Sequence, residues 1–247
     1  SFFYVQRSRF TMEILFEHPW FIVINKPSDL LTQAVESIDS VQTKVVEYLR
    51  QSSPSSTTPF VGIPHRLDRV TTGVLVVARN QRSLRRLSEQ FATRKVLKKY
   101  HAVIDLPLAF ASQLDTENAL TCVDYLRKIP NESRGEICQL SDSGAREARL
   151  TIRFIRRTTQ LQQDSPLGLV EIELETGRMH QIRLQLAHRQ APIVGDTLYG
   201  STKTLEQGEF RQAPIALHAR SLVFYHPQTA ERLEFTADYP PSWNQFS

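Results

Sequence analysis

The sequence contains little cysteine and little glycine, and each shortage removes a class of protein. Of 247 residues only 2 are Cys, at positions 122 and 138, and 9 are Gly. Two cysteines cannot form a disulfide scaffold or a four-ligand zinc site, which is typical of a reducing compartment. The glycines form no G-x-G-x-x-G, G-x-x-x-x-G-K-S/T or G-x-S-x-G pattern, so nucleotide-cofactor, P-loop and nucleophile-elbow sites lack their signatures.

Long apolar runs are missing too. No run of about 18 apolar residues could span a membrane, and the first four residues, SFFY, lack the basic and apolar regions of a secretory signal. At 40% apolar and 23% charged residues, the composition is that of a globular protein. The length of 247 residues fits one large domain or two intimate halves. We therefore expect a cytoplasmic protein without a membrane segment.

Histidine is not scarce, but its spacing is not that of a metal site. The chain has 7 His, yet no HExxH, no His-x-His and no cysteine pair occurs at ligand spacing. We therefore expect no metal site.

Acidic residues are scarce in one segment. Residues 61–101 contain ten Lys and Arg against two acids, a local net charge of +8, although the whole chain carries only +4. Such a block is the electrostatic footprint of a protein that binds a polyanion. For Arg82, Arg85 and Arg86 a solvated helix face is the alternative.

Hydrophobic periodicity predicts a strand-rich chain with few helices. Because strands follow one another with few intervening helices, we expect an α+β fold with a mixed, mainly antiparallel central sheet flanked by helices and loops. The predicted strands are residues 12–16, 20–25, 73–78, 97–104, 146–154, 169–175, 215–224 and 232–236. The predicted helices are 41–50, 83–94 and 178–189, and residues 51–59 are expected to be a flexible loop.

The first candidate for chemistry is Asp68, in the segment PHRLDRVTTG (residues 64–73) before a predicted strand. We expect this segment to be a loop at a sheet edge. Its neighbours His65, Arg66 and Arg69 favour the ionised form of the carboxyl group. An ionised aspartate can act as a nucleophile or a base; a structural aspartate that caps a turn or pairs with an arginine is the alternative.

The second candidate is Arg183. On a helical wheel Met179, Ile182 and Leu186 form the core-facing stripe, and Arg183 falls at its edge. Because buried charges usually have partners, Arg183 predicts a carboxylate on a neighbouring element, with Asp68 as a candidate. The alternative is a snorkelling side chain with its head in water.

The third candidate is Tyr100. In the predicted strand 97–104, Tyr100 and Ala102 share one face, while Lys99 and His101 share the other. Tyr100 can therefore reach a site while the lysines at 98 and 99 meet phosphate. A core tyrosine is the alternative.

Six pieces of sequence, in this order, resemble the RluA-type family of pseudouridine synthases. Together they extend over residues 12–236 or so. The pieces are NKP (25–27), HRLD (65–68) with TTG (71–73), KYHAV (99–103), TGRMHQIR (176–183), VGD (194–196) with YG (199–200), and LHA (217–219).

The resemblance implies the family's fold, a mixed antiparallel sheet flanked by helices with the active site in a central cleft, and neither metal nor organic cofactor. It makes Asp68 the catalytic aspartate, Arg183 its salt-bridge partner and Tyr100 the tyrosine that stacks near the uracil. It makes Arg66 the residue that fills the space left when the target uridine flips out. The other RNA contacts that we expect are Lys26, His65, Arg69, Lys98, Lys99, Arg178 and His180.

The implied reaction is isomerisation of a uridine within rRNA or tRNA, in which the N1 glycosidic bond is exchanged for a C5 one. The expected partner is an RNA stem-loop that contains the target uridine, with no obligate protein partner. We expect an N-terminal extension, residues 1–11, and a single catalytic domain, residues 12–247, without an S4 RNA-binding domain.

Three positions depart from the family pattern: Asp29, Thr72 and Asp105. We expect these departures to affect the shapes of loops and the choice of RNA rather than activity. Two other functions remain as alternatives. An RNA glycosidase would need a second acidic group, and the sequence near Asp68 offers only cations. A noncatalytic RNA-binding protein would explain the basic block but not the set of Asp68, Tyr100 and Arg183.

Overall fold

The structure is a computed structural model that describes residues 12–35, 38–52, 57–160, 163–205 and 213–246. The expected N-terminal extension, residues 1–11, and residues 53–56 of the expected loop 51–59 lie outside these ranges. No helix among the described residues is long and apolar enough to cross a membrane.

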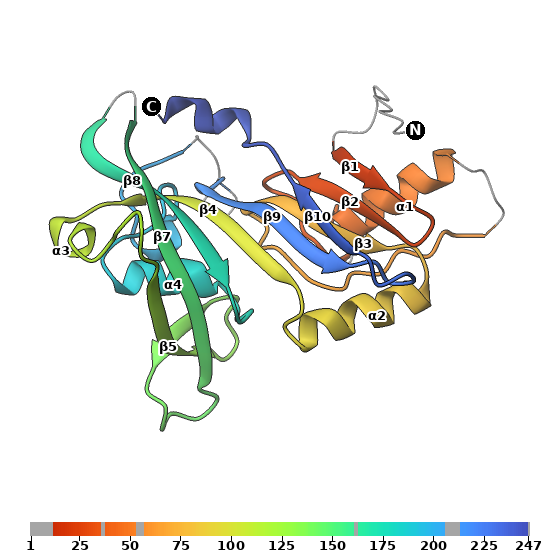
Figure 1. Ribbon diagram of the computed structural model, residues 1–247, viewed down its shortest axis with the longest axis horizontal. Coiled ribbons are helices and arrows are strands. Elements are labelled where there is room, and N and C mark those ends of the chain that lie inside the picture. The colour runs from red at the N-terminus through yellow and green to blue at the C-terminus, as the bar shows by residue number, and fades with distance from the viewer. Residues whose placement is uncertain (1–11, 36–37, 53–56, 161–162, 206–212, 247) are drawn as a thin grey trace.

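One ten-stranded sheet runs through the described molecule, in the order β1-β2-β3-β9-β4-β8-β7-β5-β6, with β10 paired to β9 (Figure 1). All of these neighbours are antiparallel except β3 and β9, so the predicted α+β fold with a mixed, mainly antiparallel sheet is confirmed. The strands are β1 (Glu13–Glu17), β2 (Phe21–Lys26), β3 (Thr72–Ala78), β4 (Leu97–Asp105), β5 (Leu120–Lys128), β6 (Gly135–Cys138), β7 (Arg146–Gln160), β8 (Gln163–Leu174), β9 (Leu217–Tyr225) and β10 (Arg232–Thr236). The helices are α1 (Val41–Ser52), α2 (Gln81–Ala92), α3 (Leu108–Ala111) and α4 (Gln181–His188), with 3-10 turns η1 (Thr197–Tyr199) and η2 (Pro241–Gln245).

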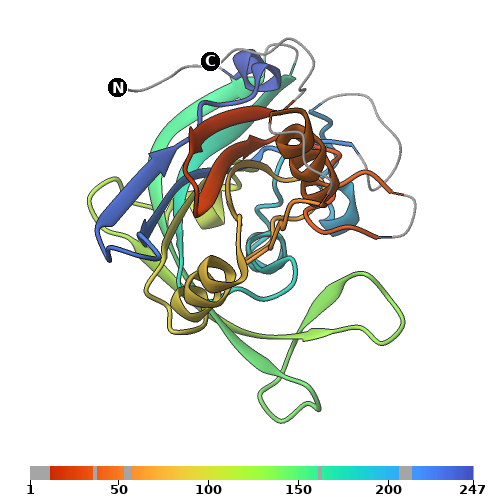
Figure 2. The ribbon, with the colours of Figure 1, turned by 90° about the vertical axis from the view of Figure 1, so that its right-hand side faces the viewer.

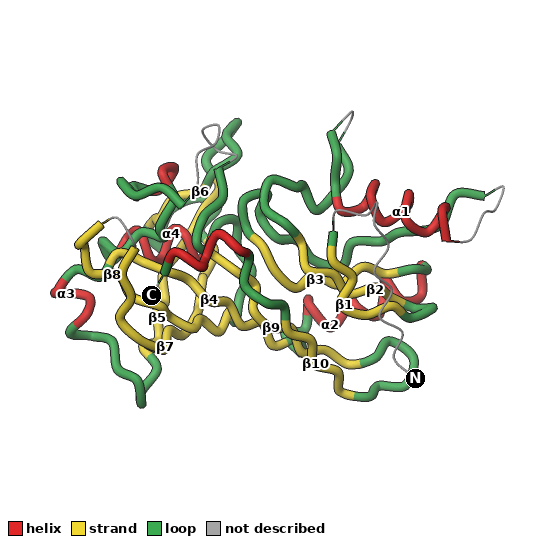
Figure 3. The backbone as a smooth tube through the Cα atoms, turned by 90° about the horizontal axis from the view of Figure 1, so that it is seen from above, coloured by secondary structure: helices red, strands yellow, loops and turns green. Residues whose placement is uncertain are grey.

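Alternation along β2 and β3 divides their apolar side chains between two cores. The larger core also contains the buried residues of α1 and, from α4, Ile182 and Leu186, whereas the smaller one contains Leu87 of α2. Figure 3 shows α1 and α4 on the same side of the sheet. Ile22, Ile24, Leu75 and Val77 belong to the larger core, and Phe21, Val23, Val74 and Val76 to the smaller.

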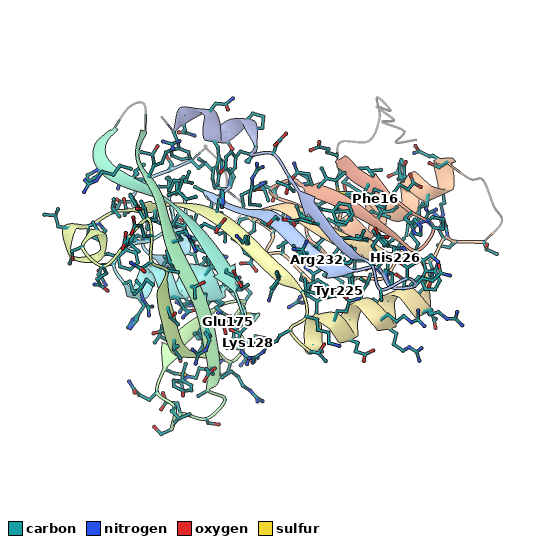
Figure 4. The ribbon with its side chains drawn as sticks, in the orientation of Figure 1. Phe16, Lys128, Glu175, Tyr225, His226 and Arg232 are labelled. Atoms are coloured by element: carbon teal, nitrogen blue, oxygen red, sulfur yellow. The ribbon has the colours of Figure 1, made fainter. Side chains whose placement is uncertain are left out.

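The smaller core is aromatic. The ring of Phe21 lies 5.4 Å from that of Phe224 and 5.4 Å from that of His226. Phe16 and His226, labelled in Figure 4, lie at the same end of the molecule. Offset and edge-on ring contacts of this kind add to the free energy gained by burying apolar area. This end of the sheet is therefore a firm base for the elements that carry the site.

The strand pairing of the sheet is interrupted between β3 and β9. These strands pair at only two positions, Thr72 with His218 and Gly73 with Ala219. Farther along β3, the chain that precedes it lies against its edge, where Gly62 forms a bridge with Ala78. The segment between that bridge and β3, which contains the HRLD motif, is thus inserted in the middle of the sheet and not at an outer edge.

Gly73 closes this inserted segment. Its φ is +112°, and a β-carbon there would lie 2.3 Å from the carbonyl oxygen of Ala219. Both the positive φ and the contact with the neighbouring backbone require glycine. The TTG motif therefore ends the loop of Asp68 against β9 at a fixed point.

The helix predicted at 178–189 begins three residues late, at Gln181. His180 has a left-handed backbone (φ 51°), and the side-chain oxygen of Gln181 accepts a hydrogen bond from Arg178 N at 3.0 Å. Residues 178–180 are therefore a turn. Met179 lies outside the helix and is 36% exposed, so its predicted place in the apolar stripe was wrong, whereas Ile182 and Leu186 are buried as predicted.

The sequence prediction also missed β5, β6 and α3. The segment coloured green, which includes β5, β6 and the start of β7, projects away from the rest of the molecule (Figure 2). On β5 only Cys122 and Leu126 are buried. Such a sparse apolar pattern gives little periodicity, because most of the hairpin faces water.

Candidate active site

The loop of Asp68 is held by two side chains from the chain before it. Thr32 Oγ1 donates to Leu67 O (2.8 Å) and accepts from Leu67 N (3.2 Å). Lys26 Nζ donates to Arg69 O at 3.0 Å and to Pro27 O at 2.8 Å. The residues on both sides of Asp68 are therefore fixed through their backbone, which leaves its side chain free to face the cleft.

Lys26 is completely buried, and burial lowers its pKa to about 7 despite the charges of Asp68 and Asp29. Its amino group donates to one carbonyl oxygen in the loop, that of Arg69, and to that of the adjacent Pro27. The contact with Arg69 holds the loop, and the expected contact of Lys26 with RNA stays a prediction.

His65 packs beside the loop as a neutral ring. It stacks on Phe91 with centroids 4.3 Å apart, and its Nε2 accepts a hydrogen bond from Val76 N at 3.1 Å. Burial, with the charge of Lys98 nearby, lowers its pKa to about 3. The contact of His65 with RNA stays a prediction. Because its ring is neutral, His65 does not add a positive charge beside Asp68.

Arg183 is buried, with two carboxylates within reach. Its Nε and Nη2 bind Asp196 Oδ2 and Oδ1 at 2.7 and 2.8 Å, a bidentate pair. Its Nη1 lies 3.5 Å from Asp68 Oδ2. Burial alone would lower the pKa of Arg183, but the hydrogen bonds and charge of Asp196 outweigh it and raise that pKa. The expected contact with Asp68 is present, but Asp196 is the closer partner.

A second network reaches Asp68 through His180. Tyr199 OH accepts from Gly135 N at 3.3 Å and lies 2.8 Å from His180 Nδ1. Burial lowers the pKa of His180, so the ring is neutral. The other ring nitrogen, Nε2, faces Asp68 Oδ2 at 3.8 Å. His180 thus lies beside the carboxylate, and its expected contact with RNA stays a prediction.

Tyr100 is 8% exposed, and burial, together with the charge of Asp68, raises its pKa. It lines the same cleft as Asp68, and so does Lys98, whose pKa is lowered to about 8 by burial. Lys99 instead pairs with Glu171 at 3.1 Å, and His101 lies 3.5 Å from the same carboxylate. The predicted separation of faces along β4 is therefore confirmed, and it turns Lys99 away from the cleft.

Two cavities meet at Asp68. One has a volume of about 670 Å³ and is lined by residues that include Arg66, Tyr100 and Arg178. The other, of about 640 Å³, is lined by Arg69 and Asp196 among others. Asp68, His180 and Arg183 line both, and the Asp68 side chain is 30% exposed. A buried, paired arginine therefore lies behind a solvent-accessible carboxylate where the two cavities meet.

Comparison with known proteins identifies the kind of site. The sequence profile of the family described as RNA pseudouridylate synthase matches residues 20–188, from β2 through α4. The tRNA pseudouridine synthase C of Vibrio parahaemolyticus is 31% identical over 248 residues, which covers 95% of this chain and 93% of that protein. The chain belongs to the RluA-type family of RNA pseudouridine synthases. It is an RNA pseudouridine synthase, an isomerase.

Further relatives agree with this assignment. The ribosomal large subunit pseudouridine synthase D of Vibrio cholerae is 30% identical over 237 residues, covering 93% of this chain and 68% of that protein. Among solved structures, human RNA pseudouridylate synthase domain containing 1 has a TM-score of 0.70 at 23% identity and covers 96% of this chain and 87% of that chain. The latter likeness shows the fold. As an isomerase, this chain is neither a glycosidase nor a noncatalytic binding protein.

Two departures of this synthase from the family pattern are accommodated by the structure. Asp29, where the family commonly has glycine, has a φ of 59°, a conformation that aspartate tolerates better than most residues. It also pairs with Arg69 at 2.8 Å. Thr72, where serine is common, keeps the hydroxyl, which lies 2.8 Å from Nδ1 of buried His218. Both changes therefore preserve the position of the loop.

Sequence reasoning about this synthase missed the importance of Asp196 and Tyr199. Neither residue was a candidate for chemistry, although both belong to motifs on which the resemblance rests. Gly195 precedes Asp196 with a φ of 90°, and a β-carbon on it would lie 2.7 Å from Pro214 O. That constraint fixes Asp196, which is 1% exposed, beneath Arg183. The available signal was the buried arginine itself, because it required a fully buried partner.

Proposed function

We propose that this pseudouridine synthase uses Asp68 as its catalytic carboxylate, toward a uridine flipped into the cleft, with Arg183 as the positioning cation and Tyr100 packed against the base. The supporting observation is the 3.5 Å contact between Asp68 Oδ2 and buried Arg183 Nη1 at the junction of the cavities. A cation at this distance attracts a carboxylate and fixes its direction. Arg183 can thus orient Asp68 toward the ribose.

The reaction needs charge and enclosure. The bond between N1 and C1′ breaks, the uracil rotates, and a bond between C5 and C1′ forms; C5 then loses its proton to solvent and N1 gains one. A carboxylate beside the ribose can attack C1′ or remove a sugar proton. Tyr100, with its raised pKa, stays neutral throughout and offers a flat ring that keeps the detached base in place.

We propose base flipping because Asp68 lies inside a cleft. A base within a stem or stacked loop is not accessible to a carboxylate inside a cleft, and its extrusion costs a few kcal/mol. Arg66, which is exposed and lines both cavities, is placed to fill the space that the base leaves. Lys98 and Arg178, in the larger cavity, are placed to bind the neighbouring phosphates.

The substrate that we propose is a stem-loop of tRNA or large-subunit rRNA, since relatives are named for both. The relatives are bacterial RNA-modifying enzymes, so we place the reaction in the cytoplasm. One sheet joins β1 to β10, and we propose that residues 12–247 form a single catalytic domain.

The test is chromatography of the nucleosides obtained from uridine-containing tRNA and rRNA transcripts after incubation with the protein. Pseudouridine should appear with wild type and be absent with Asp68→Asn, while binding of the transcript is retained. Pseudouridine formation by Asp68→Asn would refute the role of this carboxylate. Mapping of pseudouridines in cells that lack the protein then identifies which RNA and which position it modifies.

A further inference from the structure

The outer side of α2 carries cations that no acidic side chain neutralises. Arg82 and Arg85 on the helix and Arg94 and Lys95 just after it are exposed. None of these four forms a salt bridge within the described part of the chain, whereas Arg79, Arg127, Arg134, Arg149, Arg189, Arg220 and Arg232 each have a carboxylate partner. Glu89 is the single acid on α2.

Arg86 is different from its neighbours. Its Nη1 donates to Pro227 O at 2.6 Å, and its guanidinium lies 6.0 Å from the ring centre of Trp20. Arg86 therefore fastens α2 to the sheet, which leaves Arg82 and Arg85 as the helix arginines directed to solvent.

Arg82 does not help α2 to form. The first turn of α2 contains no acidic residue and does contain Arg82, although the positive end of a helix dipole favours negative charge. Arg82 is also three and four residues from Arg85 and Arg86, spacings at which like charges repel. A partner outside the chain therefore accounts better for the presence of Arg82.

The four exposed cations Arg82, Arg85, Arg94 and Lys95 form a strip that begins at the active site. Phe91, Ala92 and Arg94, at the end of α2, line the larger cavity together with Lys98. From Ala92, the last residue of α2, back to Arg82 the helical rise gives a length of about 15 Å. Nitrogen-tipped side chains along the outer side of α2 are visible in Figure 4. RNA that leaves the cleft on this side would meet Arg94 and Lys95 first, and Arg85 and Arg82 farther along the helix.

The strip offers charge without stacking surfaces. None of the large apolar side chains that are exposed among the described residues belongs to α2. Unpaired bases are bound by aromatic platforms as well as by cations, whereas a paired stem presents regularly spaced phosphates. The observations therefore favour a duplex over a single strand.

We propose that the outer side of α2, with Arg82 and Arg85 on the helix and Lys95 after it, binds the phosphate backbone of the stem next to the target uridine, outside the catalytic cleft. The proposal rests on the proposed function. It divides the work on the RNA: the cleft takes the flipped nucleotide, and α2 holds the duplex from which the nucleotide came. Removal of these charges changes affinity, not chemistry.

The test compares Arg82→Gln/Arg85→Gln with wild type in binding a synthetic RNA hairpin that has a uridine-containing loop. The control is Arg153→Gln/Arg157→Gln, which removes two exposed arginines from β7, a strand that lines neither cavity. We expect the α2 variant to bind about 10-fold more weakly and to lose about 2 from the slope of log K against log salt, because each phosphate contact contributes close to 0.9. The β7 variant should bind like wild type.

Two further measurements distinguish stem binding by α2 from a general loss of RNA affinity. The loop sequence without its stem should bind both variants equally well, and the α2 variant's kcat on saturating hairpin should match wild type while its KM rises. Equal hairpin binding and equal salt slopes for the two double variants would overturn the proposal. So would retention of wild-type protein, but not the α2 variant, on phosphatidylserine vesicles with hairpin binding unchanged. Because binding is measured directly, the result does not depend on whether Asp68 performs the chemistry.

Discussion

At the scale of single residues, the site depends on one buried cation between two carboxylates. Arg183 binds Asp196 through two hydrogen bonds and reaches Asp68 with its remaining nitrogen. Asp196 is nearly inaccessible, while Asp68 faces the cleft. One carboxylate therefore stabilises the arginine, and the arginine positions the other.

Substitutions of Arg183 and Asp196 separate the effect on stability from the effect on activity. Arg183→Met should lower the free energy of unfolding by about 3 to 5 kcal/mol, because it leaves Asp196 buried and unpaired. Arg183→Met/Asp196→Leu should recover most of that loss, since no buried charge remains, yet stay inactive because Asp68 lacks its cation. Urea unfolding and pseudouridine formation measure the two effects. Full activity in the double variant would show that Arg183 does not act through Asp68.

Lys26 predicts a pH dependence of stability. Its pKa in the folded protein is about 7, below the ordinary value of 10.5. Between these values the unfolded chain binds a proton that the folded chain does not, so this residue makes stability rise with pH from about 7 to 10.5 and contributes no slope below about 7. The stability of Lys26→Met should rise less steeply with pH in that window, because the titrating group is gone. Melting temperatures from pH 7 upward compare the two proteins, and identical slopes would contradict the burial of a neutral Lys26.

At the scale of elements, the parting of β3 from β9 decides where the loop of Asp68 lies. The two strands touch at Gly73, and the loop occupies the space beyond. The positions of β2 and β3 followed from short apolar runs rich in β-branched residues, because both strands are buried on both faces. The expected eight strands correspond to β1, β2, β3, β4, β7, β8, β9 and β10. Which strands pair was not readable, since a sequence pattern specifies a face and not a neighbour.

Gly73 is the critical point of this junction. Gly73→Ala should destabilise the protein strongly, because its β-carbon would lie 2.3 Å from Ala219 O at a φ of +112°. Gly177→Ala is the matched control, since a β-carbon there would meet no atom within 4 Å. Thermal unfolding should show a lower melting temperature for the first and little change for the second. Equal melting temperatures for the two variants would refute the close approach.

The candidate site was predictable only where the sequence pattern by itself marks a residue. Asp68, Arg183 and Tyr100 carry visible signals, namely a carboxylate among cations, a charge at an apolar edge and a polar tip on a strand. Asp196 carries none by itself, because its role depends on a three-dimensional contact with α4. The start of α4 was also misplaced, since the left-handed backbone of His180 has no signature in the apolar pattern.

At the scale of the whole molecule, the distribution of positive charge agrees with the position of the cleft. The net charge of +4 is modest, yet four cations of residues 61–101 line the two cavities, namely Arg66, Arg69, Arg94 and Lys98, and Arg82 and Arg85 are exposed along α2. The two halves of the sheet meet at the loop that carries Asp68 (Figure 1). An RNA held by α2 would therefore present its flipped nucleotide to the place where both halves contribute side chains.

The most direct test of the central claim is tritium release from RNA labelled at uridine C5, with enzyme in excess over RNA so that a single turnover is observed. Excess enzyme removes differences in affinity, so the rate reports on chemistry. Wild type and Asp238→Asn, whose side chain is 98% exposed, should release tritium at the same rate. Asp68→Asn should release none above background; release at the wild-type rate would contradict the assignment of Asp68 as the catalytic carboxylate.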